Sequence, residues 1–370
     1  MKRSNIIKKI YSKQLIQLLK GFFDYNIMAH FRPLPPRHIL MPITYRCNAR
    51  CVMCNIWKMP IKAELTIGQI DQILADDIFR SVETLTITGG EPILRDDLVE
   101  LVALFIGKLT RLNQLTITTN GLLPDKTNRF IQKIAQTCLK NNIHLSVSVS
   151  VDGVGEVHDR IRGIPGAFEK IEKAISQLKE LQKEYGFYLG GGCVVQPSSL
   201  HNLSDLEQWH KKNDFDGSFQ LLGFHETYVA NLNKKDEINF TEKDREFLLT
   251  FMEKKSKDKS LFNFQSYYWH DMLQMYKHGK PRKTVCPMMM DAFVLDAYGD
   301  VYWCLSEPEA KIGNCLSGPS CSEIYYSPDN LKVRKYIREN KCPTCNSGCL
   351  TRFGIKNNIF RYLWYLLLRQ

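Results

Sequence analysis

Three cysteines, Cys47, Cys51 and Cys54, lie close together in the chain with the spacing C-x3-C-x2-C. No further cysteine follows until Cys138. A cubane [4Fe–4S] cluster normally takes four thiolates, so a cluster held by these three would leave one iron open to bind another molecule. An open iron is a chemical handle, and the spacing therefore points to catalysis rather than to electron storage alone.

A structural zinc site is the simpler interpretation of the same cysteines, because zinc fingers also space cysteines by two to four residues. A closed zinc site needs a fourth ligand. The nearest histidines, His30 and His38, are separated from the cysteines by a proline-rich segment or lie at its end. Zinc therefore stays open as an alternative that requires a ligand from elsewhere in the chain.

The middle of the chain alternates between short apolar segments and helical patterns. The strand candidates are rich in Ile, Val, Leu and Thr and cover 40–45, 84–88, 115–119, 145–151, 188–195 and 219–222. The helical patterns between them cover 67–79, 98–109, 126–140, 168–185 and 203–212. This alternation predicts an α/β fold with a parallel sheet and outer helices, a partial (β/α)6 TIM-like barrel.

Each predicted strand ends in glycine, polar or charged residues, and in parallel barrels the chemistry lies at these carboxyl ends. Gly89-Gly90-Glu91-Pro92 follows the second strand, where the glycines allow close backbone approach and Glu91 can accept a hydrogen bond from a positive group. Ser150 and Asp152 end the fourth strand and alternate onto one side of the extended chain. A hydroxyl and a carboxylate in that position suit a ribose diol.

The segment 43–57, which carries the three cysteines, resembles the signature loop of the radical S-adenosylmethionine (SAM) superfamily. The resemblance implies that Cys47, Cys51 and Cys54 hold a catalytic [4Fe–4S] cluster whose open iron is chelated by SAM. It implies that one electron, from a reductant such as flavodoxin or ferredoxin, cleaves SAM to a 5′-deoxyadenosyl radical. That radical would then abstract hydrogen from a substrate.

The same resemblance implies a set of SAM-binding residues at the strand ends: Gly89, Gly90, Glu91, Asn120, Ser150, Asp152 and Arg162. The Gly89–Glu91 stretch would contact the amino group of SAM, and Ser150 with Asp152 would contact its ribose. Arg162 would pair with the SAM carboxylate, which suits a guanidinium fork, and Arg160 stays an alternative. Asn120 would support the same pocket.

A second group of cysteines lies near the end of the chain, around a β-hairpin predicted over 294–303 with its turn at 298–300. The pattern C-x12-G-x4-C followed by C-x2-C resembles the auxiliary-cluster extensions of radical SAM enzymes, the SPASM domain and its shortened form, the twitch domain. The resemblance implies one auxiliary [4Fe–4S] cluster, with zinc as the alternative. Its ligands would be Cys286, Cys304, Cys342 and Cys345, with Cys349 as a substitute for one of them.

Composition limits the function classes only partly. The 370 residues are 44% hydrophobic and carry a net charge of +11, which suits an anionic substrate, an anionic membrane surface or nucleic acid. No basic stripe interleaved with aromatic residues appears, so nucleic acid is not expected. The clustered cysteines and the lack of a signal peptide or of a run of about 20 apolar residues predict a cytoplasmic protein.

Both ends of the chain have an amphipathic or apolar character. Residues 1–30 combine basic side chains with apolar residues at mostly helical spacing, and 359–368 are apolar and aromatic apart from Arg361. Such segments can lie on the inner face of a membrane, or they can pack against the protein and close the open barrel edge. Both interpretations stay open.

The sequence thus predicts a division of the chain into an N-terminal basic helix, a radical SAM barrel, a helical connector, an auxiliary-cluster domain and an apolar tail: 1–38, 39–230, 231–280, 281–350 and 351–370. The expected substrate is a small alcohol, a sugar or a lipid-linked group, with dehydrogenation as one outcome if the auxiliary cluster accepts an electron. The alternatives are a peptide-modifying enzyme, disfavoured because the residues before Cys47 do not resemble a leader-binding domain, and a non-catalytic zinc-binding scaffold.

Overall fold

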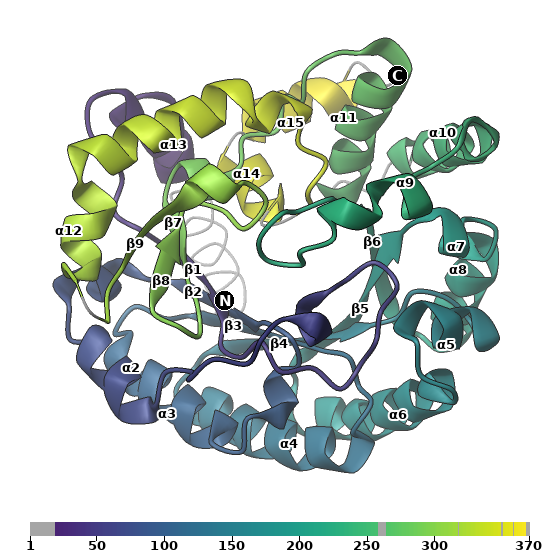
Figure 1. The fold of residues 1–370 in the computed structure, drawn as a ribbon, viewed down its shortest axis with the longest axis horizontal. Coiled ribbons are helices and arrows are strands. Elements are labelled where there is room, and N and C mark those ends of the chain that lie inside the picture. Colours follow the sequence, from purple (N-terminus) through teal and green to yellow (C-terminus); the bar gives the residue numbers. More distant parts are fainter. Residues whose placement is uncertain (1–18, 258–263, 317, 349–350, 358, 368–370) are drawn as a thin grey trace, which may run out of the picture.

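The computed structural model describes residues 19–257, 264–316, 318–348, 351–357 and 359–367. One sheet runs through this part of the chain, with its strands in the order β6-β5-β4-β3-β2-β1-β7-β8-β9 (Figure 1). Its strands are β1 (His38–Pro42), β2 (Thr84–Thr88), β3 (Gln114–Thr119), β4 (His144–Ser150), β5 (Tyr188–Val195), β6 (Asp216–Leu221), β7 (Ala292–Leu295), β8 (Asp300–Tyr302) and β9 (Lys311–Asn314).

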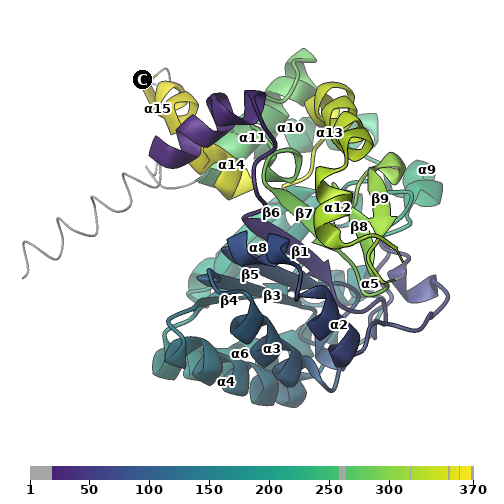
Figure 2. The same ribbon diagram turned by 90° about the vertical axis from the view of Figure 1, so that its left-hand side faces the viewer.

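In this order, each strand from β6 through β1 to β7 pairs in parallel with the next, whereas β7 with β8 and β8 with β9 pair antiparallel. Helices cover the outer side of the parallel strands and continue beyond them (Figures 1 and 2). The helices are α2 (Ile67–Ile73), α3 (Leu98–Lys108), α4 (Pro124–Lys140), α5 (Glu156–Arg162), α6 (Ala167–Tyr185), α7 (Pro197–Leu200), α8 (Leu203–Lys212), α9 (Lys235–Ile238), α10 (Glu242–Ser256), α11 (Phe264–His278), α12 (Cys321–Tyr326), α13 (Pro328–Asn340), α14 (Thr351–Asn357) and α15 (Ile359–Leu367).

Alternation along the central strands separates an apolar face from a polar one. In β2, Leu85 and Ile87 are fully buried and belong to the core that also contains Phe105 of α3. Thr86 and Thr88, which alternate with them, are half-buried. Because successive side chains point to opposite faces of a strand, the small hydroxyl residues lie on the inner side of the curved sheet, away from the helices. The candidate site therefore forms on a polar inner surface.

The predicted α/β architecture is confirmed, although the sheet does not close into a barrel within the described residues, where β6 and β9 are its two ends. The hairpin predicted over 294–303 is present as β7 and β8. The sequence did not indicate β9, nor that β7 pairs in parallel with β1. The predicted helix over 67–79 is too long: α2 ends at Ile73, and the Asp76 side chain accepts from the Ile78 amide to start a separate 3-10 turn.

The first and last described segments of the chain contact each other. Residues 1–18, which carry most of the predicted basic helix, lie outside the described residues. In α15, Tyr362 and Tyr365 are buried and pack against Tyr267 of α11, and Phe360 contacts Phe22 with ring centroids 4.8 Å apart. None of the described helices has the length and apolar character needed to cross a bilayer.

Candidate active site

The cysteine loop begins directly after β1 and is held on two sides. On one side it pairs with α5, because the Arg50 amide donates to the Arg162 carbonyl and the Val52 amide to the Ile161 carbonyl, both at 2.9 Å. On the other side, the segment after β6 reaches over the loop. There Asn231 Nδ2 donates to the Met53 carbonyl at 2.9 Å, and Lys234 Nζ donates to the Val52 carbonyl at 2.8 Å. The loop is thus fixed by contacts distant in sequence.

The three thiols of this loop lie near one another in a largely apolar surrounding. Burial, with smaller effects from the neighbouring thiols, raises the pKa of Cys47 to about 11 and that of Cys54 to about 12. Arg162 Nη1 lies 3.6 Å from Cys51 Sγ, and Asn120 Nδ2 lies 3.9 Å from Cys47 Sγ. A bound iron cluster would favour the thiolates that burial disfavours. Three converging thiols with adjacent donors therefore fit a three-cysteine cluster.

The two glycines of the Gly89-Gly90-Glu91 stretch hold the chain against the entrance of the cysteine loop. A Cβ on Gly89, whose φ is 135°, would lie 2.2 Å from the Thr44 carbonyl oxygen, and a Cβ on Gly90 would lie 2.2 Å from the Arg46 carbonyl oxygen. The Gly90 amide donates to Thr44 at 2.8 Å. Close approach thus explains both glycines, but here the approaching group is the protein's own backbone.

Substitution of Gly90 tests this packing. We expect Gly90→Ala to destabilise the fold by about 1–3 kcal/mol, because the new methyl group cannot fit against the backbone of Arg46. Urea denaturation monitored by circular dichroism measures the change. Gly107→Ala is the matched control, since Gly107 lies in α3 with nothing within 4 Å of the added carbon, and it should stabilise by about 0.5–1 kcal/mol. Equal effects of the two substitutions would contradict the packing argument.

Glu91 ties the end of β2 to the end of β3. Its carboxylate is buried and accepts hydrogen bonds from the amide of Asn120 at 2.6 Å, the hydroxyl of Thr119 at 2.9 Å and the amide of Ile93 at 3.0 Å. Burial nevertheless raises the pKa of Glu91. The side chain therefore has an evident structural role at the strand ends, and its contact with the SAM amino group stays a prediction.

Arg162 and Asp152 form a buried ion pair, with Arg162 Nη2 2.6 Å from Asp152 Oδ2. The other oxygen of Asp152 accepts from the Val194 amide at 2.8 Å, so this carboxylate joins the end of β4 to β5 and α5. Burial acts to lower the pKa of Arg162, but Asp152 and Cys51 raise it above its ordinary value. Arg162 is thus held as a cation beside Cys51, and Asp152 already has protein partners where a ribose contact was predicted.

Two further predicted residues border the same region. Ser150 ends β4 and is half-buried on the inner side of the sheet. Asn120 is buried, and its Nδ2 donates to Asn48 Oδ1 at 2.8 Å as well as approaching Cys47. The structure therefore gathers the predicted residues of strands two, three and four around the cysteine loop.

Several residues of this site were not indicated by the sequence as functional. Gln196, at the end of β5, is buried with its Nε2 3.7 Å from Met53 Sδ. The hydroxyl of Tyr228 donates to the Gly89 carbonyl at 3.1 Å. The side chains of Asn231 and Lys234 donate to carbonyls of the cysteine loop. The positions of Gln196 after the fifth predicted strand and of Tyr228 shortly after the sixth mark these two residues, whereas Asn231 and Lys234 belong to a later 3-10 turn that the sequence did not indicate.

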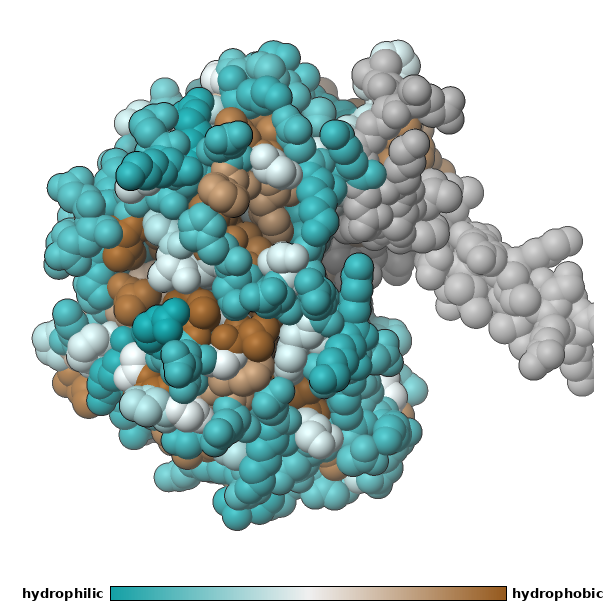
Figure 3. Space-filling model, turned by 90° about the vertical axis from the view of Figure 1, so that its right-hand side faces the viewer, coloured by the Kyte–Doolittle hydropathy of each residue, from teal (hydrophilic) through white to brown (hydrophobic). Residues whose placement is uncertain are grey.

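Apolar side chains surround the cysteine loop on its open side. They include Val157 and Ile161 of α5, Ile238 of α9, and Leu222 and Phe224, which follow β6. Figure 3 shows hydrophobic residues gathered in a hollow on the side of the molecule that carries α5, α9 and α10, with hydrophilic residues around it. The apolar side chains packed around the loop would exclude water from reactive species formed there.

The second cysteine group also comes together. Burial, with the thiols of Cys286 and Cys345, raises the pKa of Cys304 to about 12. The pKa of Cys342 is raised by burial and by the same thiols. Arg282 links the segments that carry these cysteines, since its Nη1 donates to the Ser347 carbonyl at 2.6 Å. The four predicted auxiliary ligands are therefore neighbours.

The remaining C-terminal cysteines fall outside this group. Cys349 lies outside the described residues. Cys315 and Cys321 pair with each other, and a hydrogen bond between their thiols lowers the pKa of Cys315. Among the described side chains, no three of the types His, Cys, Asp or Glu come close enough to share a single ion.

Comparison with known proteins decides the family. Residues 41–194 match the Radical SAM superfamily. This part of the chain is a radical SAM domain. The match begins within β1 and ends within β5, so it contains the cysteine loop, the Gly89–Glu91 stretch and the Asp152–Arg162 pair. The radical SAM match accordingly implies SAM and a [4Fe–4S] cluster at the cysteine loop.

Three curated relatives extend the comparison beyond this domain. The antilisterial bacteriocin subtilosin biosynthesis protein AlbA of Bacillus subtilis is 24% identical over 96% of this chain and 76% of its own length. A cysteine-type anaerobic sulfatase-maturating enzyme of Clostridium novyi is 25% identical over 86% of this chain and 87% of its own. The pre-heme d1 synthase of Dinoroseobacter shibae is 31% identical, over 55% of this chain and about half of that protein (49%).

Solved structures agree on the fold. The structure of native anSMEcpe with bound AdoMet and Cp18Cys peptide has a TM-score of 0.57, at 19% sequence identity, over 91% of this chain and 100% of that chain. The likeness of fold therefore extends over most of the chain and beyond the matched radical SAM domain.

Proposed function

We propose that this radical SAM enzyme modifies a peptide or protein substrate. The observation that carries the proposal is the similarity to the subtilosin biosynthesis protein over 96% of this chain, because it includes the regions on both sides of the barrel. The sulfatase-maturating relative matches over a similar extent. These relatives favour the peptide alternative over the small alcohol, sugar or lipid-linked group that the sequence first suggested.

An open cavity next to the cysteine loop supports a peptide substrate. It has a volume of about 570 Å3 and is lined by both basic and acidic side chains, among them Arg46, Lys62, Glu64 and Asp96. Ile61 at its rim is 75% exposed. A surface with charges of both signs and an exposed apolar anchor suits a polymer with varied side chains better than a small polyol.

Each residue of the site has a separate role in the proposed reaction. The bound cluster and SAM supply a 5′-deoxyadenosyl radical. Arg162, held as a cation by Asp152, offers its guanidinium to the SAM carboxylate, and Ser150 offers a hydroxyl to the ribose. Glu91 and Asn120 keep the strand ends in register around the loop. The apolar side chains of α5 and α9 exclude water.

The C-terminal cysteines extend the proposal to a second centre. Cys286, Cys304, Cys342 and Cys345 would hold one auxiliary cluster of the twitch type within residues 281–350. It would accept an electron from a substrate radical or bind the peptide. An external reductant of the flavodoxin or ferredoxin class would supply the electron for SAM cleavage.

The experiment compares substrate classes directly. The reconstituted enzyme is incubated anaerobically with SAM and dithionite, together with either a peptide library rich in Cys and Ser or a set of small alcohols and sugars. We expect peptides to increase 5′-deoxyadenosine formation and to show a mass change in the product. Stimulation by the polyols alone would contradict the peptide assignment.

A tetrapyrrole is the second candidate substrate, favoured by the 31% identity to the pre-heme d1 synthase. That similarity extends over 55% of this chain and about half of the relative, a smaller share of this chain than the peptide-related similarities cover. Adding an iron porphyrin to the same assay separates the two candidates, because only a tetrapyrrole enzyme would modify the porphyrin and leave every peptide unchanged.

A further inference from the structure

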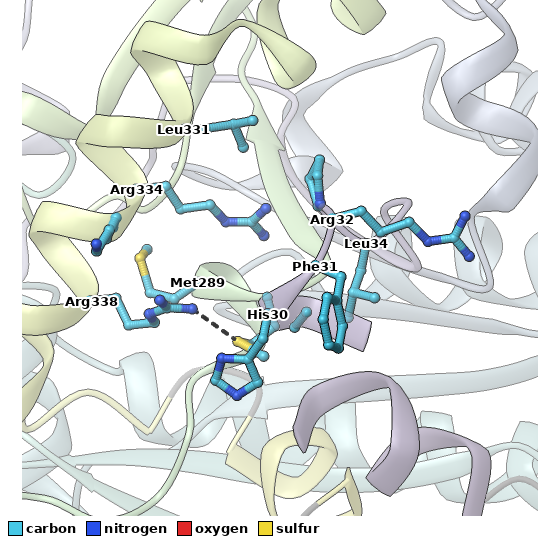
Figure 4. Close-up of a pocket in the computed structure, with 12 residues that line it drawn as sticks. His30, Phe31, Arg32, Leu34, Met289, Leu331, Arg334 and Arg338 are labelled. Carbon is cyan, nitrogen blue, oxygen red and sulfur yellow. Dashed lines mark hydrogen bonds between the residues drawn. The ribbon is translucent and has the colours of Figure 1, made fainter. Parts of the chain in front are cut away.

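A second cavity, of about 260 Å3, lies between residues 29–34 and helix α13 and shares no residue with the active site (Figure 4). Five basic side chains line it, and none of its lining residues is acidic. They are His30, Arg32, Arg334, Lys335 and Arg338. The rest of the lining is largely apolar and includes Phe31, Met289 and Leu331. Such a lining suits a ligand with an anionic group attached to an apolar part.

Helix α13 supplies three of these cations from one face. Leu331, Arg334, Lys335 and Arg338 are spaced at i, i+3, i+4 and i+7, which places them along a single stripe. Like charges four residues apart, such as Arg334 and Arg338, weaken a helix when nothing balances them. Within the described residues, none of the three has a carboxylate within ion-pair distance. An anion in the cavity would neutralise these positive charges.

Arg334 makes this argument strongest because its side chain is only 6% exposed. Its partners are all neutral: the Tyr325 hydroxyl at 3.2 Å, the carbonyls of Met288 and Ala292 at 3.3 and 3.5 Å, and the rings of Trp303 and Tyr325 at 4.3 and 5.2 Å. Its Nε has no hydrogen-bond partner. A buried cation without an anionic partner is costly, so its place in a cavity wall points to an anionic ligand.

The segment 19–31, which ends at the cavity, exposes several large apolar side chains. Leu19, Phe23, Ile27 and Phe31 follow one another at four-residue intervals and are 50%, 46%, 41% and 81% exposed. Phe31 also lines the cavity. Aromatic and aliphatic side chains beside a basic patch are typical of protein surfaces that lie in the interface of an anionic membrane.

We propose that this cavity binds the phosphate headgroup of an anionic phospholipid, with the exposed apolar side chains of residues 19–31 in the adjoining bilayer interface. The guanidinium groups of Arg334 and Arg338 and the ammonium group of Lys335 contact the phosphate. His30 and Arg32 come from the opposite wall, although the Arg32 side chain extends away from the arginines of α13 (Figure 4). Attachment at this site is independent of the proposed peptide substrate.

Vesicle sedimentation of the full-length protein tests the site. We expect binding to vesicles of phosphatidylcholine mixed with phosphatidylglycerol and little binding to phosphatidylcholine alone. Arg338→Glu and Lys335→Glu together should weaken binding at least about tenfold, since each reversal replaces an attraction by a repulsion. Lys332→Glu is the matched control, because Lys332 lies on α13 outside the cavity lining and pairs with Asp329. It should change binding far less.

All of these proteins keep the basic residues at the start of the chain, so a loss confined to the double variant assigns binding to the cavity. Equal binding by the double variant and the control would overturn the proposal. So would direct binding of soluble glycerol phosphate, measured by calorimetry, without any binding to vesicles, which would mark a site for a free phosphate compound instead.

Discussion

Replacement of Cys47, Cys51 and Cys54 together by alanine is expected to abolish the reductive cleavage of SAM. The three thiols are neighbours at the end of β1, and no other cysteine group of the described chain lies beside the Gly89–Glu91 stretch. Without them the open iron that SAM needs cannot be held. The measurement is 5′-deoxyadenosine formed with dithionite under anaerobic conditions, by chromatography and mass spectrometry.

Cys138→Ala is the control for this loss. Cys138 is a buried cysteine of α4, 1% exposed, and packs in the hydrophobic core rather than in the cysteine loop. The control should keep most of the activity, apart from a modest loss of stability. If the triple variant still cleaved SAM at a rate similar to the wild-type enzyme, the assignment of the catalytic cluster would be wrong.

Asp152→Ala is expected to destabilise the fold by about 3–5 kcal/mol. The substitution leaves Arg162, which is 7% exposed, as a buried cation without its carboxylate partner. It also removes the acceptor of the Val194 amide between β4 and β5. Chemical denaturation of the iron-free protein measures the effect without interference from the clusters.

A double-mutant cycle identifies the cause. Arg162→Met alone should also be strongly destabilising, because it leaves the Asp152 carboxylate buried and unpaired. The double variant Asp152→Ala with Arg162→Met should lose much less than the sum of the two single variants, since neither charge remains. Additive losses would show that the two side chains act independently and would contradict the role given to the pair.

Local patterns were sufficient to predict much of the sheet. The segments 84–88 and 188–195 coincide with β2 and β5: alternation followed by glycine marks the first, and an apolar run between Gly186 and Pro197 marks the second. The pairing of β7 with β1 could not be predicted, because it joins residues more than 250 positions apart and depends on the whole fold. The same holds for β9, a short and weakly apolar strand.

In the candidate site too, the sequence predicted local features but not contacts between distant segments. The cysteine spacing identified the loop, since three ligands in one segment are a local feature. The actual partners of Glu91 and Asp152 come from other strands, so the sequence suggested a ligand where the structure shows the protein's own groups. Asn231 and Lys234, whose side chains donate to carbonyls of the loop, lie at the start and end of a single 3-10 turn, which is too short to leave a sequence pattern.

The metal content of the anaerobically purified and reconstituted protein tests the central claim most directly. Iron, acid-labile sulfide and zinc are measured per chain for the wild-type protein and for a variant lacking Cys286 and Cys304. The account predicts about eight irons with matching sulfide in the wild type, from two four-iron clusters, and about four in the variant. Zinc without sulfide would contradict the account.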